Sequence, residues 1–117
     1  MESREVTLVV GGSGFVGVEL VRHLVNAGRT VRVFDENPIG DSEVERNIQF
    51  VKGDVRNLDA VRDAVKGTSK VYHLAAMVPL TRAGEVFSQV NAGGTKNVII
   101  ASTEANIKHL VHLSSSA

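Results

Sequence analysis

Short apolar runs recur along the chain, and the stretches between them carry apolar residues at helical spacing. Val6–Val10 is rich in β-branched residues, which is typical of a strand covered on both faces, as in a parallel sheet. Four further runs follow, and each also predicts a strand. The expected strands are Val6–Val10, Thr30–Asp35, Ile48–Lys52, Lys70–Ala75 and His109–Ser114.

Three segments between these runs predict helices. The first spans Phe15 to Ala27, with Leu20 and Leu24 among its apolar positions, and Gly28 supplies its stop. The second covers residues 57–66, with Asn57 as its cap and Gly67 at its end. The third is long, from about residue 84 to 105, and Asn106 favours the left-handed conformation after it. Residues 36–47 are polar and predict a loop with room for one helical turn.

Regular alternation of strands and helices with short connections predicts an α/β protein. We expect a three-layer, Rossmann-type fold in which helices cover both faces of a parallel sheet. The expected strand order is 3-2-1-4-5, and the sheet would stop after the fifth strand. A ligand crevice is then expected at the carboxyl ends of strands 1 and 4, where the winding reverses.

Composition narrows the functional classes. At 117 residues the chain predicts one domain, taken as residues 1–117. Thirteen basic residues balance thirteen acidic ones, which argues against nucleic acid or an anionic membrane as a partner. The chain has no cysteine, which excludes thiolate chemistry and fits a cytoplasmic location. Its four histidines lack the spacing of metal ligands, so no metal is expected.

Three glycines follow the first strand. Gly11, Gly14 and Gly17 form G-x-x-G-x-x-G at the start of a helix, a spacing that lets a backbone approach a pyrophosphate closely. The amino end of the helix offers unpaired N–H groups to the anion. A P-loop is excluded because Gly17 is followed by Val18 and Glu19 instead of Lys and Ser or Thr.

An acidic residue lies where the ribose of a dinucleotide would be. Asp35 closes the second strand, 21 residues after Gly14, and can accept both hydroxyls of the adenosine ribose. Glu36 follows it without an adjacent Arg or Lys, so a 2′-phosphate would be repelled and NAD preferred over NADP. The alternative is that Asp35 only ends a strand at a turn.

Several motifs in order resemble the extended short-chain dehydrogenase/reductase family, which includes NAD-dependent epimerases, dehydratases and 3β-hydroxysteroid-type dehydrogenases. Residues 11–17 are similar to its glycine signature, and residues 90–97 to its Asn…Gly-Thr-x-Asn helix. The resemblance implies two kinds of site residue. The residues that would bind the cofactor are Gly11, Gly14, Phe15, Val16, Gly17 and Asp35, together with Asp54 and Val55 at the adenine and Leu74, Ala75 and Ala76 at the nicotinamide ribose. Asn91 and Ser115 would take part in catalysis.

Some of these positions also have purely structural explanations. Asp54 is a good turn former, and Ser115 could belong to a polar strand end. Ala75 and Ala76 could be small because a helix and a strand approach there. The Gly93–Gly94 pair indicates close backbone packing within the long helix, either for site geometry or for the sheet alone.

The family's catalytic Tyr-x-x-x-Lys is absent. The single tyrosine, Tyr72, is followed four residues later by Ala76 and precedes Ser115. The chain thus resembles the first third of such an enzyme, an NAD-binding domain expected to have little turnover alone. The alternative is a non-catalytic dinucleotide-binding module, or a half-site completed by a partner chain. An uncovered fifth strand would favour a homo-oligomer or a partner along that edge.

Overall fold

The computed structural model describes residues 5–11, 15–75 and 94–114. The described strands are β1 (Val6–Val10), β2 (Thr30–Asp35), β3 (Gln49–Lys52), β4 (Thr68–Ala75) and β5 (His109–Ser114). The described helices are α1 (Phe15–Asn26), α2 (Ser42–Glu45) and α3 (Leu58–Val65), together with a helical segment over residues 94–104.

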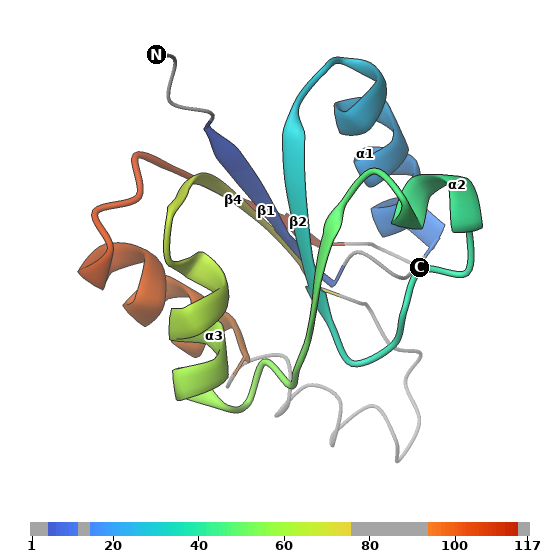
Figure 1. Cartoon of the computed structure of the whole chain (residues 1–117). Helices are drawn as coiled ribbons and strands as arrows, with labels where there is room; N and C mark the ends of the chain where they lie inside the picture. The colour runs from blue at the N-terminus through green and yellow to red at the C-terminus, as the bar shows by residue number, and fades with distance from the viewer. Residues whose placement is uncertain (1–4, 12–14, 76–93, 115–117) are drawn as a thin grey trace.

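The strands form one sheet in the order β3-β2-β1-β4-β5, and every pairing is parallel. This confirms the predicted fold class and strand order. The chain winds from β1 outward through β2 to β3, then crosses back to β4 on the other side of β1 (Figure 1). The carboxyl ends of β1 and β4 therefore flank the point where the winding reverses, which is where open α/β sheets bind ligands.

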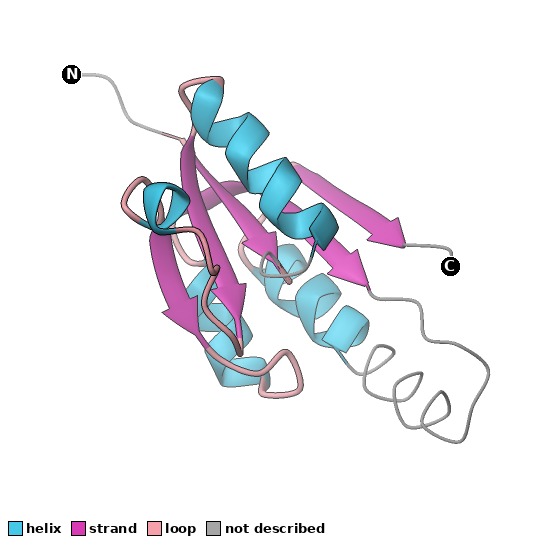
Figure 2. Ribbon diagram, turned by 90° about the vertical axis from the view of Figure 1, so that its right-hand side faces the viewer, coloured by secondary structure: helices cyan, strands magenta, loops and turns pink. Residues whose placement is uncertain are grey.

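Helices cover both faces of the sheet. In Figures 1 and 2, α1 and α2 lie on one face, and α3 and the segment 94–104 lie on the other. Successive side chains of β1 point to opposite faces of the sheet and so contribute to both cores. Leu8 and Val10 pack toward α3, and Val9 packs toward α1. The core under α3 contains Leu8, Val10, Phe34, Val61, Ala64, Val65, Val71, Val98 and Ala101, and the core under α1 contains Val9, Val21, Leu24, Val31, Val33, Ile39 and Val44.

The predicted helix ends are confirmed. Gly28, Gly67 and Asn106 have φ angles of 81°, 80° and 56°, the left-handed region that ends helices. The Asn57 side chain accepts a hydrogen bond from the Ala60 N–H at 3.2 Å and caps α3. The polar loop after β2 holds the single turn α2, capped by the Asp41 carboxylate.

The predicted start of β4 was wrong. This strand begins at Thr68, two residues before the expected start at Lys70. The register against β1 shifts between Val6 and Thr7, because Val6 pairs with Thr68 whereas Thr7 pairs with Lys70. The extra residue of β4 is a bulge-like irregularity, which a strand pattern read from alternation misses. The predicted start of the long helix, at residues 84–93, lies outside the described residues.

Candidate functional site at the carboxyl ends of the strands

The turn after β1 is confined between both neighbouring strands. The Gly11 N–H donates to the Phe34 carbonyl of β2 at 2.9 Å, and Gly11 has a φ of 87°. A Cβ atom on Gly11 would lie 2.8 Å from the Leu74 carbonyl oxygen of β4. A side chain is therefore excluded at Gly11 both by backbone conformation and by space.

The chain leaves this turn into α1. Gly14 lies outside the described residues, and Phe15 is the first residue of α1. Val16 is exposed in the first turn, whereas Gly17 is buried. The amino end of a twelve-residue helix thus follows β1 at the switch point, an arrangement that suits anion binding.

Asp35 lies beside this turn at the carboxyl end of β2. The residue before it, Phe34, pairs with Val10 and holds the Gly11 amide, so the structure brings Gly11 and Asp35 to adjacent strand ends. The half-buried Asp35 carboxylate accepts the Asn37 N–H at 3.0 Å, and its carbonyl accepts the Gly53 N–H at 3.1 Å. Both its side chain and its backbone are therefore held in place.

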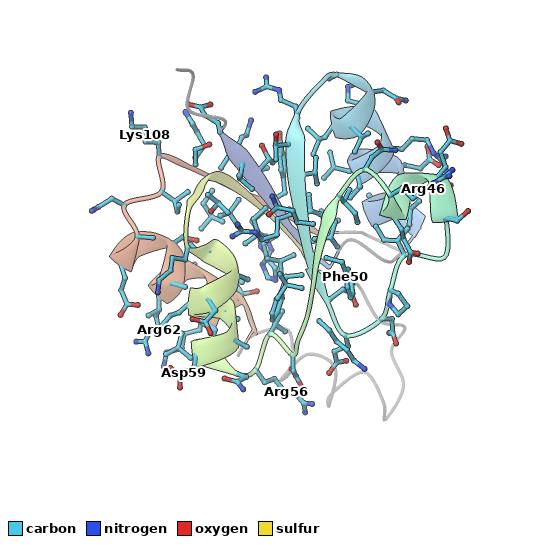
Figure 3. All side chains as sticks on the ribbon, viewed as in Figure 1. Arg46, Phe50, Arg56, Asp59, Arg62 and Lys108 are labelled. Carbon is cyan, nitrogen blue, oxygen red and sulfur yellow. The ribbon has the colours of Figure 1, made fainter. Side chains whose placement is uncertain are left out.

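The loop after β3 places one further carboxylate, that of Asp54, beside Glu36. The Arg56 guanidinium holds Asp54 through both carboxylate oxygens, with Nε–Oδ1 and Nε–Oδ2 distances of 3.0 and 2.9 Å. Hydrogen bonding from Arg56 lowers the pKa of Asp54 to about 2. The hydrogen bond and charge of Asp54 raise the pKa of Glu36. Figure 3 shows Arg56 at this end of the molecule, near the start of α3.

The cluster formed by these carboxylates determines which ligand groups the surface attracts. Asp35 and Glu36 are consecutive, and Glu36 interacts with Asp54, so negative charge gathers at the ends of β2 and β3. The guanidinium of Arg56 is engaged by Asp54. Such a surface favours hydroxyl and amino donors over a phosphate.

Val55 is held by the helical segment 94–104. The Asn97 amide donates to the Val55 carbonyl at 2.8 Å. A Cβ atom on Gly94 would lie 2.6 Å from Cγ2 of Val55, so the glycine makes room for this side chain. The close packing predicted for the glycine pair is therefore confirmed at Gly94, and its partner is the loop after β3.

The ends of β4 and β5 meet next to the first turn. Ala75 pairs with Ser114, and Leu74 contributes the carbonyl that faces Gly11. Two residues before Ala75, His73 pairs with His112, and their Nδ1 atoms are 3.1 Å apart. Burial, with a smaller effect of the His112 charge, lowers the pKa of His73 to about 4.

The structure thus brings together most of the described site residues predicted from sequence. Gly11, Asp35, Asp54, Val55 and Leu74 all lie at the carboxyl ends of strands or directly after them. Ala76, Asn91 and Ser115 lie outside the described residues. Sequence reasoning assigned no contact to Asn97 or Arg56, and the Gly-Thr-x-Asn spacing was the signal available for Asn97.

Neither a metal centre nor a membrane span is found in the part of the chain that the structure describes. Within it, no three His, Cys, Asp or Glu side chains gather as metal ligands. No helix in those ranges has the length and apolar character that crossing a membrane requires.

Comparison with known proteins decides the family. The model of the 3-beta hydroxysteroid dehydrogenase/isomerase family matches residues 8–117. The chain belongs to this family. The resemblance to extended short-chain dehydrogenases/reductases is thereby confirmed, including its hydroxysteroid-type branch.

Two curated relatives illustrate the match to this family. An uncharacterized protein of Sinorhizobium fredii is 42% identical over 113 residues, which cover 97% of this chain and 28% of that protein. The decarboxylating sterol-4-alpha-carboxylate 3-dehydrogenase of Mus musculus is 39% identical over 109 residues, or 93% of this chain and 29% of the mouse protein.

A solved structure supports the same assignment. The crystal structure of a short-chain dehydrogenase/reductase superfamily protein from Agrobacterium tumefaciens, with bound NAD, matches with a TM-score of 0.81 and 34% identity. The match covers 95% of this chain and 33% of that one. The chain therefore spans a third or less of the length of these proteins.

Proposed function

We propose that this chain is the NAD-binding part of a family oxidoreductase that acts on the hydroxyl-bearing carbon of a steroid-like alcohol. The observation that carries the cofactor part of the proposal is the juxtaposition of Gly11 and Asp35 at adjacent strand ends, and the family match supports the substrate class. The family assignment and the NAD in the Agrobacterium relative support the same cofactor class.

In this proposal, different strand ends would hold different parts of the dinucleotide. The backbone at Gly11 and the amino end of α1 would hold the pyrophosphate, and Asp35 would accept the ribose hydroxyls. Asp54 and Val55 would meet the adenine, and Leu74 to Ala76 would pass the nicotinamide ribose. Negative charge from Asp35 and Glu36 would disfavour the 2′-phosphate of NADP.

Chemistry at the nicotinamide end would depend on Asn91, before β5, and on Ser115, directly after it. Bound NAD would supply the hydride-accepting ring. Ser115 would polarise the substrate oxygen, and Asn91 would help fix the geometry. A tyrosine of ordinary pKa about 10 needs a neighbouring cation to act as a base, and Tyr-x-x-x-Lys does not occur in these 117 residues. We therefore expect NAD binding without steady turnover, and sustained hydride transfer by the chain alone would contradict this.

Calorimetric titration with NAD and NADP tests the cofactor assignment. Asp35→Asn keeps an oxygen for the Asn37 amide but removes the charge that receives the ribose hydroxyls. Hydrogen bonds to a charged group contribute about 1.5–3 kcal/mol, so NAD affinity should fall about 10- to 100-fold. The preference for NAD over NADP should shrink as well.

Asp63→Asn makes the same change at an exposed position on α3 and serves as the control. Its NAD affinity should equal that of the unaltered chain. Equal NAD affinity in the Asp35 variant, or no NAD binding by the unaltered chain, would overturn the proposed function.

A further inference from the structure

Two contacts from one helix face hold the loop after β3. Gly94 and Asn97 are three residues apart in the segment 94–104, so they share a face. Gly94 receives the Val55 side chain, and the Asn97 amide donates to the Val55 carbonyl at 2.8 Å. Val55 is therefore held through its side chain and its backbone by the same helix.

The peptide plane between Val55 and Arg56 is fixed at both of its polar atoms. Asn97 binds the carbonyl oxygen of this plane at 2.8 Å. The N–H of the same plane, which belongs to Arg56, donates to Oδ1 of Asp54 at 2.8 Å. Because a peptide unit is planar, the Asn97 contact constrains where that N–H points, and hence the Asp54 carboxylate.

The rest of the loop reinforces this arrangement. A Cβ atom on Gly53 would lie 2.5 Å from Cε2 of the fully buried Phe34, so the loop is pressed against the core. The exposed Arg56 side chain binds both oxygens of Asp54. The Asn57 N–H also donates to the Asp54 carbonyl at 2.9 Å, so the 55–56 peptide is the centre of a turn whose tilt the Asn97 side chain helps to hold.

We propose that Asn97 is a positioning residue that orients the Asp54 carboxylate for the exocyclic amino group of the dinucleotide's base. This inference rests on the proposed function, since it assumes that the loop meets the adenine. It adds a residue that acts through Val55 without touching the ligand. Its loss should weaken recognition of the amino group in particular, more than dinucleotide binding in general.

The experiment compares two dinucleotides by calorimetry. NAD carries the exocyclic amino donor, and nicotinamide hypoxanthine dinucleotide carries a carbonyl oxygen in its place. The unaltered chain should prefer NAD. Asn97→Leu keeps the approximate size of the side chain and removes the donor, and Asn97→Ala is a second variant with high helix propensity. Either should lose about tenfold in NAD affinity and distinctly less for the hypoxanthine analogue.

The matched control is Asn47→Leu. Asn47 makes the same kind of bond, from its side-chain amide to the Glu43 carbonyl at 2.8 Å, but at the end of α2. Both dinucleotides should bind this variant as they bind the unaltered chain. Since a merely structural role of Asn97 would weaken both ligands equally, the ratio of the two affinities is the deciding measurement.

The possible failures are distinguishable. An unchanged ratio in the Asn97 variants, or no preference for NAD in the unaltered chain, overturns the positioning role and leaves the proposed function intact. Failure of the unaltered chain to bind either dinucleotide overturns the proposed function and the positioning role with it.

Discussion

Replacing Gly11 by alanine separates two constraints on the turn after β1. The first is backbone conformation, since Gly11 has a φ of 87°. The second is space, since a Cβ atom would lie 2.8 Å from the Leu74 carbonyl oxygen. Gly28 shares the first constraint, with a φ of 81°, but a Cβ atom there would meet no described atom within 4 Å beyond its chain neighbours. Gly28→Ala is therefore a matched control.

The magnitudes follow from these geometries. A non-glycine residue in the left-handed region costs about 1 kcal/mol, so Gly28→Ala should lower Tm by about 4 °C. Gly11→Ala adds overpacking against backbone of a central strand, about 1–3 kcal/mol more. Its loss of unfolding free energy should therefore reach about 2–4 kcal/mol.

Urea and thermal unfolding followed by circular dichroism measure both variants. Gly11→Ala should also abolish NAD binding measured by calorimetry, and Gly28→Ala should leave it unchanged. Equal stability losses in the two variants would refute the steric argument. Full NAD affinity in Gly11→Ala would refute the role of the turn.

Three further predictions concern other parts of the fold. The pKa of His73 is about 4 in the folded chain and 6.5 in the unfolded chain, so the free energy of unfolding should be highest above pH 6.5 and fall by up to about 3 kcal/mol as the pH drops to 4. His73→Gln should flatten this pH dependence in urea unfolding, and an unchanged pH dependence would contradict the lowered pKa of His73. Gly53→Ala should lower the free energy of unfolding by about 1–3 kcal/mol because its Cβ would lie 2.5 Å from the Phe34 ring. The same substitution should cost less in a chain that carries Phe34→Leu, and additive losses in a double-mutant cycle would argue against the contact. We also propose that β5 associates with another chain, because it pairs only with β4 in the described sheet and carries Leu110, which is 37% exposed. Leu110→Lys should reduce self-association in light scattering, and an unaltered chain that stays monomeric at all concentrations would exclude the proposal.

Local signals predicted most of the fold. β-branched runs marked the strands, and Asn57, Gly28, Gly67 and Asn106 marked helix ends, because capping and left-handed residues depend on a few neighbouring atoms. The strand order was predicted as the one typical of a Rossmann-type sheet, once the alternation of strands and helices had indicated a parallel α/β fold. The start of β4 was missed because the register shift next to Thr7 arises between strands.

The site was predictable where a motif carried its own geometry. Gly11 and Asp35 were identified from spacing, and the structure places them at adjacent strand ends. The Asn97 bond to Val55 and the pairing of His73 with His112 join residues about 40 positions apart. The first contact depends on how a helix packs against a loop, and the second on how two strands pair, and neither is specified by local sequence signals.

Amide chemical-shift mapping by NMR tests the central claim most directly. Adding NAD to the isotope-labelled chain should shift the amides of Gly11, Asp35 and Val55, at the carboxyl ends of the strands. Gly28 and Gly67 precede β2 and β4 at the opposite ends of the strands, and their amides should stay unchanged. Shifts confined to those opposite ends, or no shifts at saturating NAD, would contradict the account.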